Sequence, residues 1–311
     1  MDSAYLERRK KIYTENDFDL IEDCPLCHSR FYEHYYNVEA EGNDYCEENN
    51  IKKIVPVVKC LSCGFVYARE VLNAAGSDKF WEKYSSQQHD TDDEDVRKRN
   101  EMYRLEYEFI CRFMRNDKHK KDILDVGCAE GRFLDYFAKD HNCYGTEVGD
   151  EAIQISKKKH KVFQGELPQI STEQKFDLII FRGVIQYFKR PKEYFNKAID
   201  LLKPGGLIFI TSTPVADAFC HQLYKEKFNL PVCAVACNGF TISVLKDFFE
   251  TRGMELAGEK SFYEETPYAN IEKDIEKVNT AIQQKMNGRE IDSKSPAFWG
   301  NMMTLVFKKI I

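Results

Sequence analysis

The chain has 311 residues, 43% hydrophobic and 31% charged, with a formal net charge of −6, proportions that are ordinary for a globular protein. Residues 1–50 contain 13 Asp and Glu against five Lys and Arg, which argues against a nucleic-acid-binding arm, because such arms need cations to neutralise phosphates. The start of the sequence is too polar for an export signal and the apolar runs are too short to cross a bilayer. We therefore expect a cytoplasmic protein without a membrane span, and the sequence leaves open whether it forms an oligomer.

The sequence contains eleven cysteines, four of which form two CxxC pairs. Without an export signal, metal ligation and buried thiols are better explanations than disulfides. The pairs are Cys24 with Cys27 and Cys60 with Cys63. Four thiolates suit a tetrahedral, closed and therefore structural Zn²⁺ site, and reduced thiols in a small core are the alternative. Cys46 lies between the pairs and is a possible substitute ligand.

The glycine after the second CxxC pair, Gly64, can adopt a positive φ that lets backbone N–H groups face the sulfurs. Residues 1–75 show no sustained helical periodicity, so we predict that they form a small zinc-ribbon-like module. Residues 76–311 are predicted to form a second, larger domain. Within it, a first helix is expected over residues 102–114, where Met102, Leu105, Phe109 and Phe113 have helical spacing.

From residue 120 onward, short apolar strands alternate with helices. Helices are expected at 132–140, 150–160, 191–202 and 241–253, and strands at 122–127, 143–148, 162–167, 176–183, 205–214, 254–262 and 302–310. Repeated β–α units of this size predict an α/β fold with a doubly wound, mostly parallel seven-stranded sheet covered by helices on both faces.

The last two strands are separated by an insertion, residues 265–300, that contains a polar helical segment at roughly 270–287. Ile271, Ile275, Val278 and Ile282 fall on one face of this expected helix. The pattern is compatible with a lid over a substrate, with a dimer contact, or with simple packing on the sheet.

The stretch ILDVGCAEGRFL, residues 123–134, predicts a strand, a glycine turn and a following helix. Ligands bind at such turns, where the strand ends and the helix begins. The turn is marked by Asp125, Gly127 and Gly131. Glu147 ends the next strand, where an acid can accept hydrogen bonds from ribose hydroxyls. Glu166 ends the third strand, where an acid can accept a hydrogen bond from an adenine amino group. The two glycines alone are weak evidence for a cofactor, since a helix-packing turn is the alternative. The ordered set of these glycines and acids, with LLKPGG before the fifth strand, favours a nucleotide-like cofactor.

These segments resemble class I S-adenosylmethionine-dependent methyltransferases, in which LDVGCAEG resembles the first motif and GTEVGDEAI the ribose motif. The CPLC…CLSCGFVYA and SPAFWGNMMTLVFKK stretches also resemble bacterial methyltransferases with an N-terminal four-cysteine zinc module, which are often found in sugar, polysaccharide and natural-product pathways. The resemblance implies S-adenosylmethionine and structural Zn²⁺ as cofactors. It also implies a set of cofactor-binding residues: Tyr84, Asp125, Gly127, Cys128, Ala129, Gly131, Glu147, Val148, Glu166, Leu167, Arg182 and Gln186.

The sequence departs from the resembling family at two positions. Ala129 replaces the middle glycine of the first motif, and Gln186-Tyr187 replaces a frequent Glu-His pair after the fourth strand. Because that His can act as a base, its absence leaves the catalytic residues open. Tyr187 and His221 are the candidates near the expected mouth of the site, and a packed core position is the alternative for each.

The function predicted on these grounds is in-line methyl transfer, chiefly to oxygen, on a small molecule or glycan precursor such as a sugar nucleotide or capsule-type acceptor. Three other functions remain as alternatives: an RNA methyltransferase with a zinc module, a non-catalytic binding protein that keeps the fold, and a nicotinamide dehydrogenase. The acidic N-terminal residues argue against the first, and the retained acidic set against the second. The third would need Gly-x-Gly-x-x-Gly, and Gly127-Cys128-Ala129 lacks the second glycine.

Overall fold

The computed structural model describes residues 12–39, 50–81, 93–114 and 119–310. Its main element is a seven-stranded sheet with the order β12-β13-β10-β9-β6-β7-β8. Strands β8, β7, β6, β9 and β10 run parallel, whereas β13 is antiparallel to both of its neighbours, β10 and β12. This mixed sheet confirms the predicted seven-stranded, doubly wound α/β fold. The strands are β6 (Asp122–Val126), β7 (Asn142–Glu147), β8 (Lys161–Gln164), β9 (Phe176–Arg182), β10 (Leu202–Pro214), β12 (Met254–Lys260) and β13 (Met302–Lys309).

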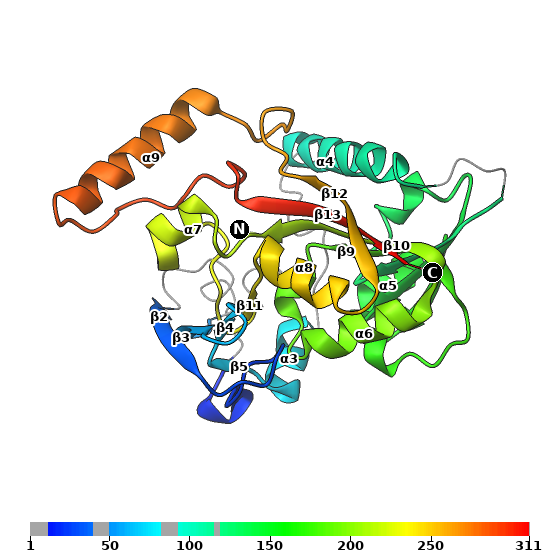
Figure 1. Ribbon diagram of the computed structural model, residues 1–311, viewed down its shortest axis with the longest axis horizontal. Helices are drawn as coiled ribbons and strands as arrows, with labels where there is room; N and C mark the ends of the chain where they lie inside the picture. The colour runs from blue at the N-terminus through cyan, green and yellow to red at the C-terminus, as the bar shows by residue number, and fades with distance from the viewer. Residues whose placement is uncertain (1–11, 40–49, 82–92, 115–118, 311) are drawn as a thin grey trace.

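Helices cover both faces of this sheet, as Figure 1 shows. Alternate residues of β9 face opposite layers, as a pleated strand requires. Leu178 and Ile180 pack with the buried side chains of α4, while Ile179 and Phe181 pack with those of α6 and α8. The helices of the larger part are α3 (Ala74–Trp81), α4 (Asp93–Cys111), α5 (Asp150–Ser156), α6 (Pro191–Leu201), α7 (Phe219–Tyr224), α8 (Ile242–Glu250) and α9 (Ile271–Met286).

The helix expected over residues 132–140 is wrong. This segment contains only a short 3-10 turn, Leu134–Tyr136, flanked by turns. Its backbone N–H groups alternate between i−3 and i−4 partners: Phe137 donates to Leu134, whereas Ala138 also donates to Leu134. Phe133, Leu134 and Phe137 are nevertheless buried beside α4, so the apolar pattern reflected packing and not a regular helix.

The N-terminal residues form two small sheets below the large one. Strand β1 (Phe18–Leu20) pairs with β5 (Glu70–Leu72), and a second sheet has the order β11-β4-β3-β2. Its members are β2 (Tyr32–Glu39), β3 (Ile54–Cys60), β4 (Val66–Ala68) and β11 (Asn238–Gly239). The edge strand β11 comes from far along the chain, and a Cβ on Gly239 would lie 2.9 Å from Val232 and 3.1 Å from Val66. Glycine therefore lets this distant segment approach the small sheet closely.

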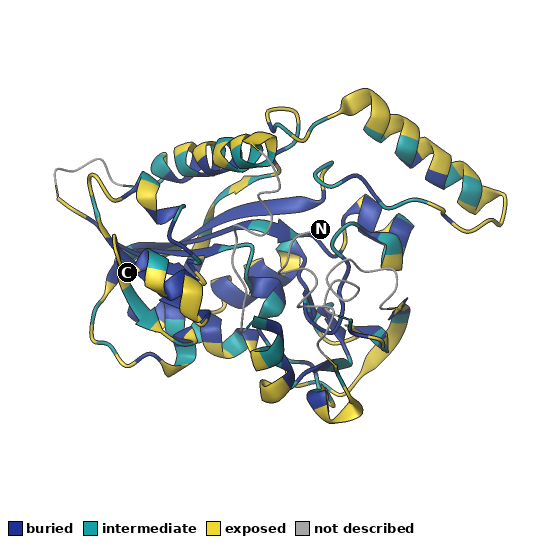
Figure 2. Ribbon diagram, turned by 180° about the vertical axis from the view of Figure 1, so that it is seen from behind, coloured by how far each residue is buried: buried dark blue, intermediate teal, exposed yellow. Residues whose placement is uncertain are grey.

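Helix α9 lies within the insertion and reaches away from the sheet (Figure 1). Its outer surface is largely exposed (Figure 2). Of the face predicted to be apolar, Val278 is buried and Ile282 half-buried, but Ile271 and Ile275 are 46% and 44% exposed. The buried side chains of α9 join those of α7 and Phe228 and not the strands, so packing on the sheet is the wrong interpretation of this helix. None of the helices in the described ranges is long and apolar enough to cross a membrane.

Candidate functional site

A cavity of about 600 Å³ opens where the parallel strands of the large sheet end. Ligands of open α/β sheets bind at this edge. Ten of the residues singled out in the sequence line this cavity: Asp125, Gly127, Ala129, Glu147, Val148, Glu166, Leu167, Arg182, Gln186 and Tyr187. The fold therefore brings together most of the expected site from five separate segments of the chain.

The turn after β6 has the backbone geometry of a close ligand approach. Gly127 has φ +71°, and a Cβ there would lie 2.9 Å from Cγ1 of Val184. Its N–H donates to the backbone oxygen of Thr146 at 2.9 Å, which ties the turn to β7. Ala129 also has a positive φ, +47°. A residue other than glycine in this left-handed conformation costs roughly 1 kcal/mol, so the backbone at position 129 favours glycine.

Two predicted cofactor residues do not line the cavity. Cys128 is buried, and its Sγ packs where a Cβ on Gly145 would lie, 2.4 Å away. Gly131, with φ +78°, faces away toward α5, where a Cβ would lie 2.6 Å from Cδ2 of His160. We infer that these two residues shape the turn by packing behind it.

Glu147 is 8% exposed, and backbone N–H groups fix its carboxylate. Oε2 accepts from Ala129 at 2.8 Å, and Oε1 accepts from Val148 at 2.7 Å and from Gly149 at 2.9 Å. A carboxylate offers about four lone-pair positions. The side chain is thus held rigidly in the cavity wall with acceptor capacity still available for a ligand hydroxyl.

Two buried oxygens of the cavity wall, Oδ1 of Asp125 and Oε1 of Gln186, have no hydrogen-bond partner among the residues that the structure describes. Burial raises the pKa of Asp125 to about 8, with the Arg182 charge opposing this and the Glu147 and Glu106 charges adding to it. Unpartnered buried acceptors are costly and call for a donor. A ligand ammonium is such a donor, so these residues fit the amino-acid end of S-adenosylmethionine.

Below the cavity, α4 contributes a residue that the sequence analysis did not single out, Glu106. Its carboxylate is 0% exposed and accepts hydrogen bonds from Arg182, Thr211 and Ser212. The sequence did contain a signal for a buried role of Glu106, because this residue lies four residues after Met102, on the same apolar face of the helix. A carboxylate within an apolar stripe needs a buried partner.

The two candidate bases lie in different environments. Tyr187 lines the cavity, with its ring 5.4 Å from that of Trp81. His221 is 1% exposed, does not line the cavity, and is enclosed by Tyr35, Tyr36 and Phe228. Its burial lowers its pKa to about 4. A neutral, enclosed imidazole cannot contact a substrate in this cavity, so the structure does not support a role for His221 as base.

Other cavity residues come from segments with no cofactor motif. They are Ser77, Asp78 and Trp81 of α3, Arg99 and Tyr103 of α4, and Lys189, Tyr194 and Leu230. The FWEKYSS stretch, from which the sequence analysis chose Tyr84 as a cofactor residue, contains Trp81 of this cavity. Tyr84 itself lies outside the described residues, and so does Cys46, the possible substitute metal ligand. Helices α3 and α4 therefore contribute to the lining of the cavity, and apart from FWEKYSS no local pattern identified these residues.

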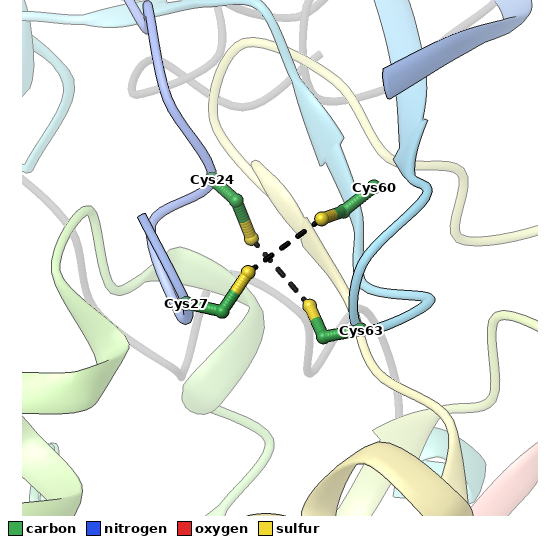
Figure 3. Close-up of side chains that lie close together, drawn as sticks. All are labelled: Cys24, Cys27, Cys60 and Cys63. Carbon is green, nitrogen blue, oxygen red and sulfur yellow. Dashed lines mark hydrogen bonds between the residues drawn. The ribbon is translucent and has the colours of Figure 1, made fainter. Parts of the chain in front are cut away.

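The four predicted metal ligands meet in the small N-terminal part, as Figure 3 shows. The sulfurs of Cys24, Cys27, Cys60 and Cys63 all lie within 4.8 Å of one another. The Cys24–Cys63 and Cys27–Cys60 distances are 3.7 and 3.6 Å. Sulfurs bound tetrahedrally at a Zn–S distance of about 2.3 Å would lie roughly 3.8 Å apart, so the cluster fits a tetrahedral ion.

The two CxxC turns share one backbone shape. In each, the residue after the second cysteine has a positive φ: His28 at +62° and Gly64 at +76°. Each of these residues also donates its N–H to the carbonyl of the first cysteine of its pair, at 2.9 Å. Gly64 thus adopts the conformation predicted for it, and the cluster consists of two CxxC turns of equivalent backbone geometry.

Comparison with known proteins identifies the class. A family model described as "Methyltransferase domain" matches residues 94–257, more than half of the chain. The chain therefore belongs to this methyltransferase family, and its larger part is a class I S-adenosylmethionine-dependent methyltransferase domain, joined to a four-cysteine cluster.

Individual relatives match over shorter stretches. An uncharacterized protein of Methanocaldococcus jannaschii is 31% identical over 109 residues, 33% of this chain and 50% of that protein. The malonyl-[acyl-carrier protein] O-methyltransferase of Haemophilus ducreyi is 27% identical over 128 residues, 37% of this chain and 50% of that protein. The chain thus spans about half the length of these curated relatives. A solved chain from the complex that contains the Haloferax volcanii Trm112 methyltransferase activator has a TM-score of 0.50 at 12% identity, covering 70% of this chain and 95% of that one.

Proposed function

We propose that this protein transfers a methyl group from S-adenosylmethionine to an oxygen of a small molecule or glycan precursor, such as a sugar nucleotide. The observation that carries the proposal is the pair of unpartnered buried oxygens, of Asp125 and Gln186, in the same cavity wall as the fixed carboxylate of Glu147. These groups match the ammonium and the ribose hydroxyls of the cofactor. When bound, the cofactor supplies a methyl group activated by a positively charged sulfur.

The residues of this chain then have separate roles. Asp125 and Gln186 accept hydrogen bonds from the amino group of the cofactor, and Glu147 accepts from its ribose. Glu166 and Leu167 also line the cavity, and their role in this proposal is to contact the adenine. Together they hold the donor in a single orientation. An acceptor held in line at about 3–3.5 Å can lower the barrier by roughly 7–11 kcal/mol.

Tyr187 is the residue best placed to act on the acceptor. It lines the cavity beside Gln186, and its ring packs edge-on against Trp81. When an acceptor hydroxyl is methylated, its proton has to leave, and a hydroxyl at the cavity wall can orient that group or pass its proton to water. A base at this step typically contributes a factor of about 10²–10⁴.

The size of the cavity favours a small acceptor over RNA. Its volume of about 600 Å³ lies in the ordinary range of small-molecule sites. The H. ducreyi relative is an O-methyltransferase, which supports oxygen as the acceptor atom.

The four-cysteine cluster is proposed to hold a structural Zn²⁺. All four positions of a tetrahedral ion would be filled by thiolates, which leaves no coordination position for a substrate or water. Its contribution is then to tie the β1–β2 loop to the turn between β3 and β4.

The experiment is a two-stage assay on the full chain. Calorimetry first measures binding of S-adenosylmethionine and S-adenosylhomocysteine to the wild type and to Asp125→Asn, for which a loss of at least tenfold in affinity for S-adenosylmethionine is expected. Nucleotide sugars, simple hydroxylated small molecules and bulk RNA are then screened for conversion of S-adenosylmethionine to S-adenosylhomocysteine. Turnover with a small hydroxylated acceptor supports the proposal. Turnover with RNA alone, or binding without any turnover, contradicts it.

A further inference from the structure

The buried carboxylate of Glu106 joins α4 to the ends of two central strands. Oε2 accepts from Nε of Arg182, at the end of β9, at 2.6 Å. Oε1 accepts from the hydroxyls of Thr211 at 2.9 Å and Ser212 at 2.6 Å, near the end of β10. A fully buried carboxylate is tolerated only when it is satisfied in this way. These three bonds fix the position of the carboxylate, and with it the position of Arg182.

The guanidinium of Arg182 is held on its other sides by aromatic rings. Its central carbon lies 4.3 Å from the ring centre of Tyr103 and 5.7 Å from that of Phe133. The bond from Nε to Glu106 uses one edge of the group, and its Nη groups make no hydrogen bond to the part of the chain that the structure describes. The side chain lines the cavity and keeps 21% of its surface exposed. A cation fixed from behind thus presents unused donors to the ligand.

Backbone strain accompanies this arrangement. Ser212 has φ +50°, in the left-handed region, and lies where the pairing of β10 with β13 shifts register between Ile210 and Thr213. This conformation is unfavourable for a residue other than glycine and persists where surrounding interactions hold it, most often at functional sites. Here the irregular backbone directs the Ser212 hydroxyl to Glu106, at 2.6 Å.

The charges around the cavity indicate what the free donors of Arg182 bind. Arg182 acts electrostatically on Asp125, whose Oδ1 lacks a partner. An α-amino acid carries an ammonium and a carboxylate on neighbouring atoms, and this cavity offers an acid and a guanidinium close together. Guanidinium groups match carboxylates because two N–H groups can face two oxygens.

We infer that Glu106 is a positioning residue that orients Arg182 to bind the carboxylate of the amino-acid end of the cofactor. The inference rests on the proposed function, since it requires S-adenosylmethionine in this cavity. It assigns to α4 a role in cofactor recognition, exerted through Arg182 and without contact between Glu106 and the ligand.

The test compares two ligands that differ at this end. S-adenosylhomocysteine carries the amino acid, and 5′-methylthioadenosine lacks it. Calorimetry on the full chain measures both ligands with the wild type, Glu106→Gln, Arg182→Met and the double variant. Glu106→Gln and Arg182→Met are each expected to weaken S-adenosylhomocysteine binding by roughly 10–100-fold, the range of a hydrogen bond to a charged group, and 5′-methylthioadenosine binding by less than threefold. The double variant should lose no more than the larger single loss, because both act through one contact.

Control variants keep the inference open to refutation. Arg99→Met removes the other cavity guanidinium, and a selective loss of S-adenosylhomocysteine binding in that variant alone would assign the carboxylate to Arg99 and overturn the inference. Equal weakening of both ligands by Glu106→Gln would show that Glu106 only supports the fold. If Glu106→Gln does not fold, Thr211→Val removes one donor to Glu106 and should give a smaller but equally selective loss. Failure of the wild type to bind either ligand would instead refute the proposed function.

Discussion

The pKa of Asp125 makes the stability of this protein depend on pH in a way that one substitution should reveal. Burial, opposed by the Arg182 charge and strengthened by those of Glu147 and Glu106, raises this pKa to about 8 from 3.8. Between these values the carboxyl group is protonated in the folded chain and ionised in the unfolded chain. The folded state then binds the extra proton, so the free energy of unfolding falls as pH rises. The stabilising contribution is full below pH 3.8 and is lost as pH rises to about 8.

The magnitude follows from the size of the shift. Each pH unit between the two pKa values removes about 1.4 kcal/mol, so the wild type loses about 3 kcal/mol between pH 5 and pH 7 through this group. Asp125→Asn cannot ionise and does not incur this loss. The free energy of unfolding of the variant, relative to the wild type, is therefore expected to rise by about 3 kcal/mol over the same interval.

Urea unfolding of the cofactor-free protein at pH 5, 6 and 7 measures this difference. Asp122→Asn is the matched control on the same strand. Burial raises the pKa of Asp122, but hydrogen bonds from Lys203 and Asn142 outweigh it and hold the pKa below its ordinary value. Asp122 is therefore ionised in both states across this interval, and its variant should differ from the wild type by a constant. Parallel curves for Asp125→Asn and the wild type would refute the reasoning.

Further predictions concern the turn, its packing and the metal cluster. Ala129→Gly should change the free energy of unfolding by less than about 1 kcal/mol, since relief of the left-handed conformation is offset by glycine's entropy. Ala129→Val should lower the free energy of unfolding by about 1 kcal/mol in urea unfolding, because a β-branched residue tolerates the left-handed region less well than alanine. Gly131→Ala should lower the free energy of unfolding by about 2–4 kcal/mol, because the new Cβ would lie 2.6 Å from His160. Gly253→Ala, at φ +74° with no atom within 4 Å, is the control and should lower it by about 1 kcal/mol. Equal losses in the two variants would contradict the packing argument. Cys63→Ser should remove the zinc found by elemental analysis and lower the melting temperature. Cys111→Ser, outside the cluster, should keep the zinc content and the melting temperature of the wild type.

The parts of the site that follow a strand could be predicted from the sequence. Asp125, Gly127 and Glu147 stand at fixed distances from apolar runs, and in a parallel sheet the carboxyl ends of strands converge on one edge. The two CxxC pairs are likewise local patterns, and the fold brings their sulfurs together.

The parts that depend on long-range packing could not be predicted. Glu106 acquires its role only when α4 lies against the ends of β9 and β10, 76 and 105 residues further along. His221 is polar and follows a strand, which suggested an active-site base, but its ring fills a space between aromatic side chains of the N-terminal strands and residue 228. The apolar run 132–140 has helical spacing, yet close packing beside α4 suffices to bury it without a regular helix.

The short strand β11 has a consequence for the order in which the chain can fold. The sheet that carries Cys60 is completed by Asn238 and Gly239, which pair with Tyr67 and Val66, and Phe240 packs 4.8 Å from Phe65. During synthesis the ribosome must release more than half of the chain before this last strand can arrive. The four thiols are made early, and during that interval the sheet that carries Cys60 is unfinished. If the cluster holds zinc as proposed, we expect nascent chains that stop before residue 238 to bind it weakly and to oxidise readily, which couples metal supply to chain completion.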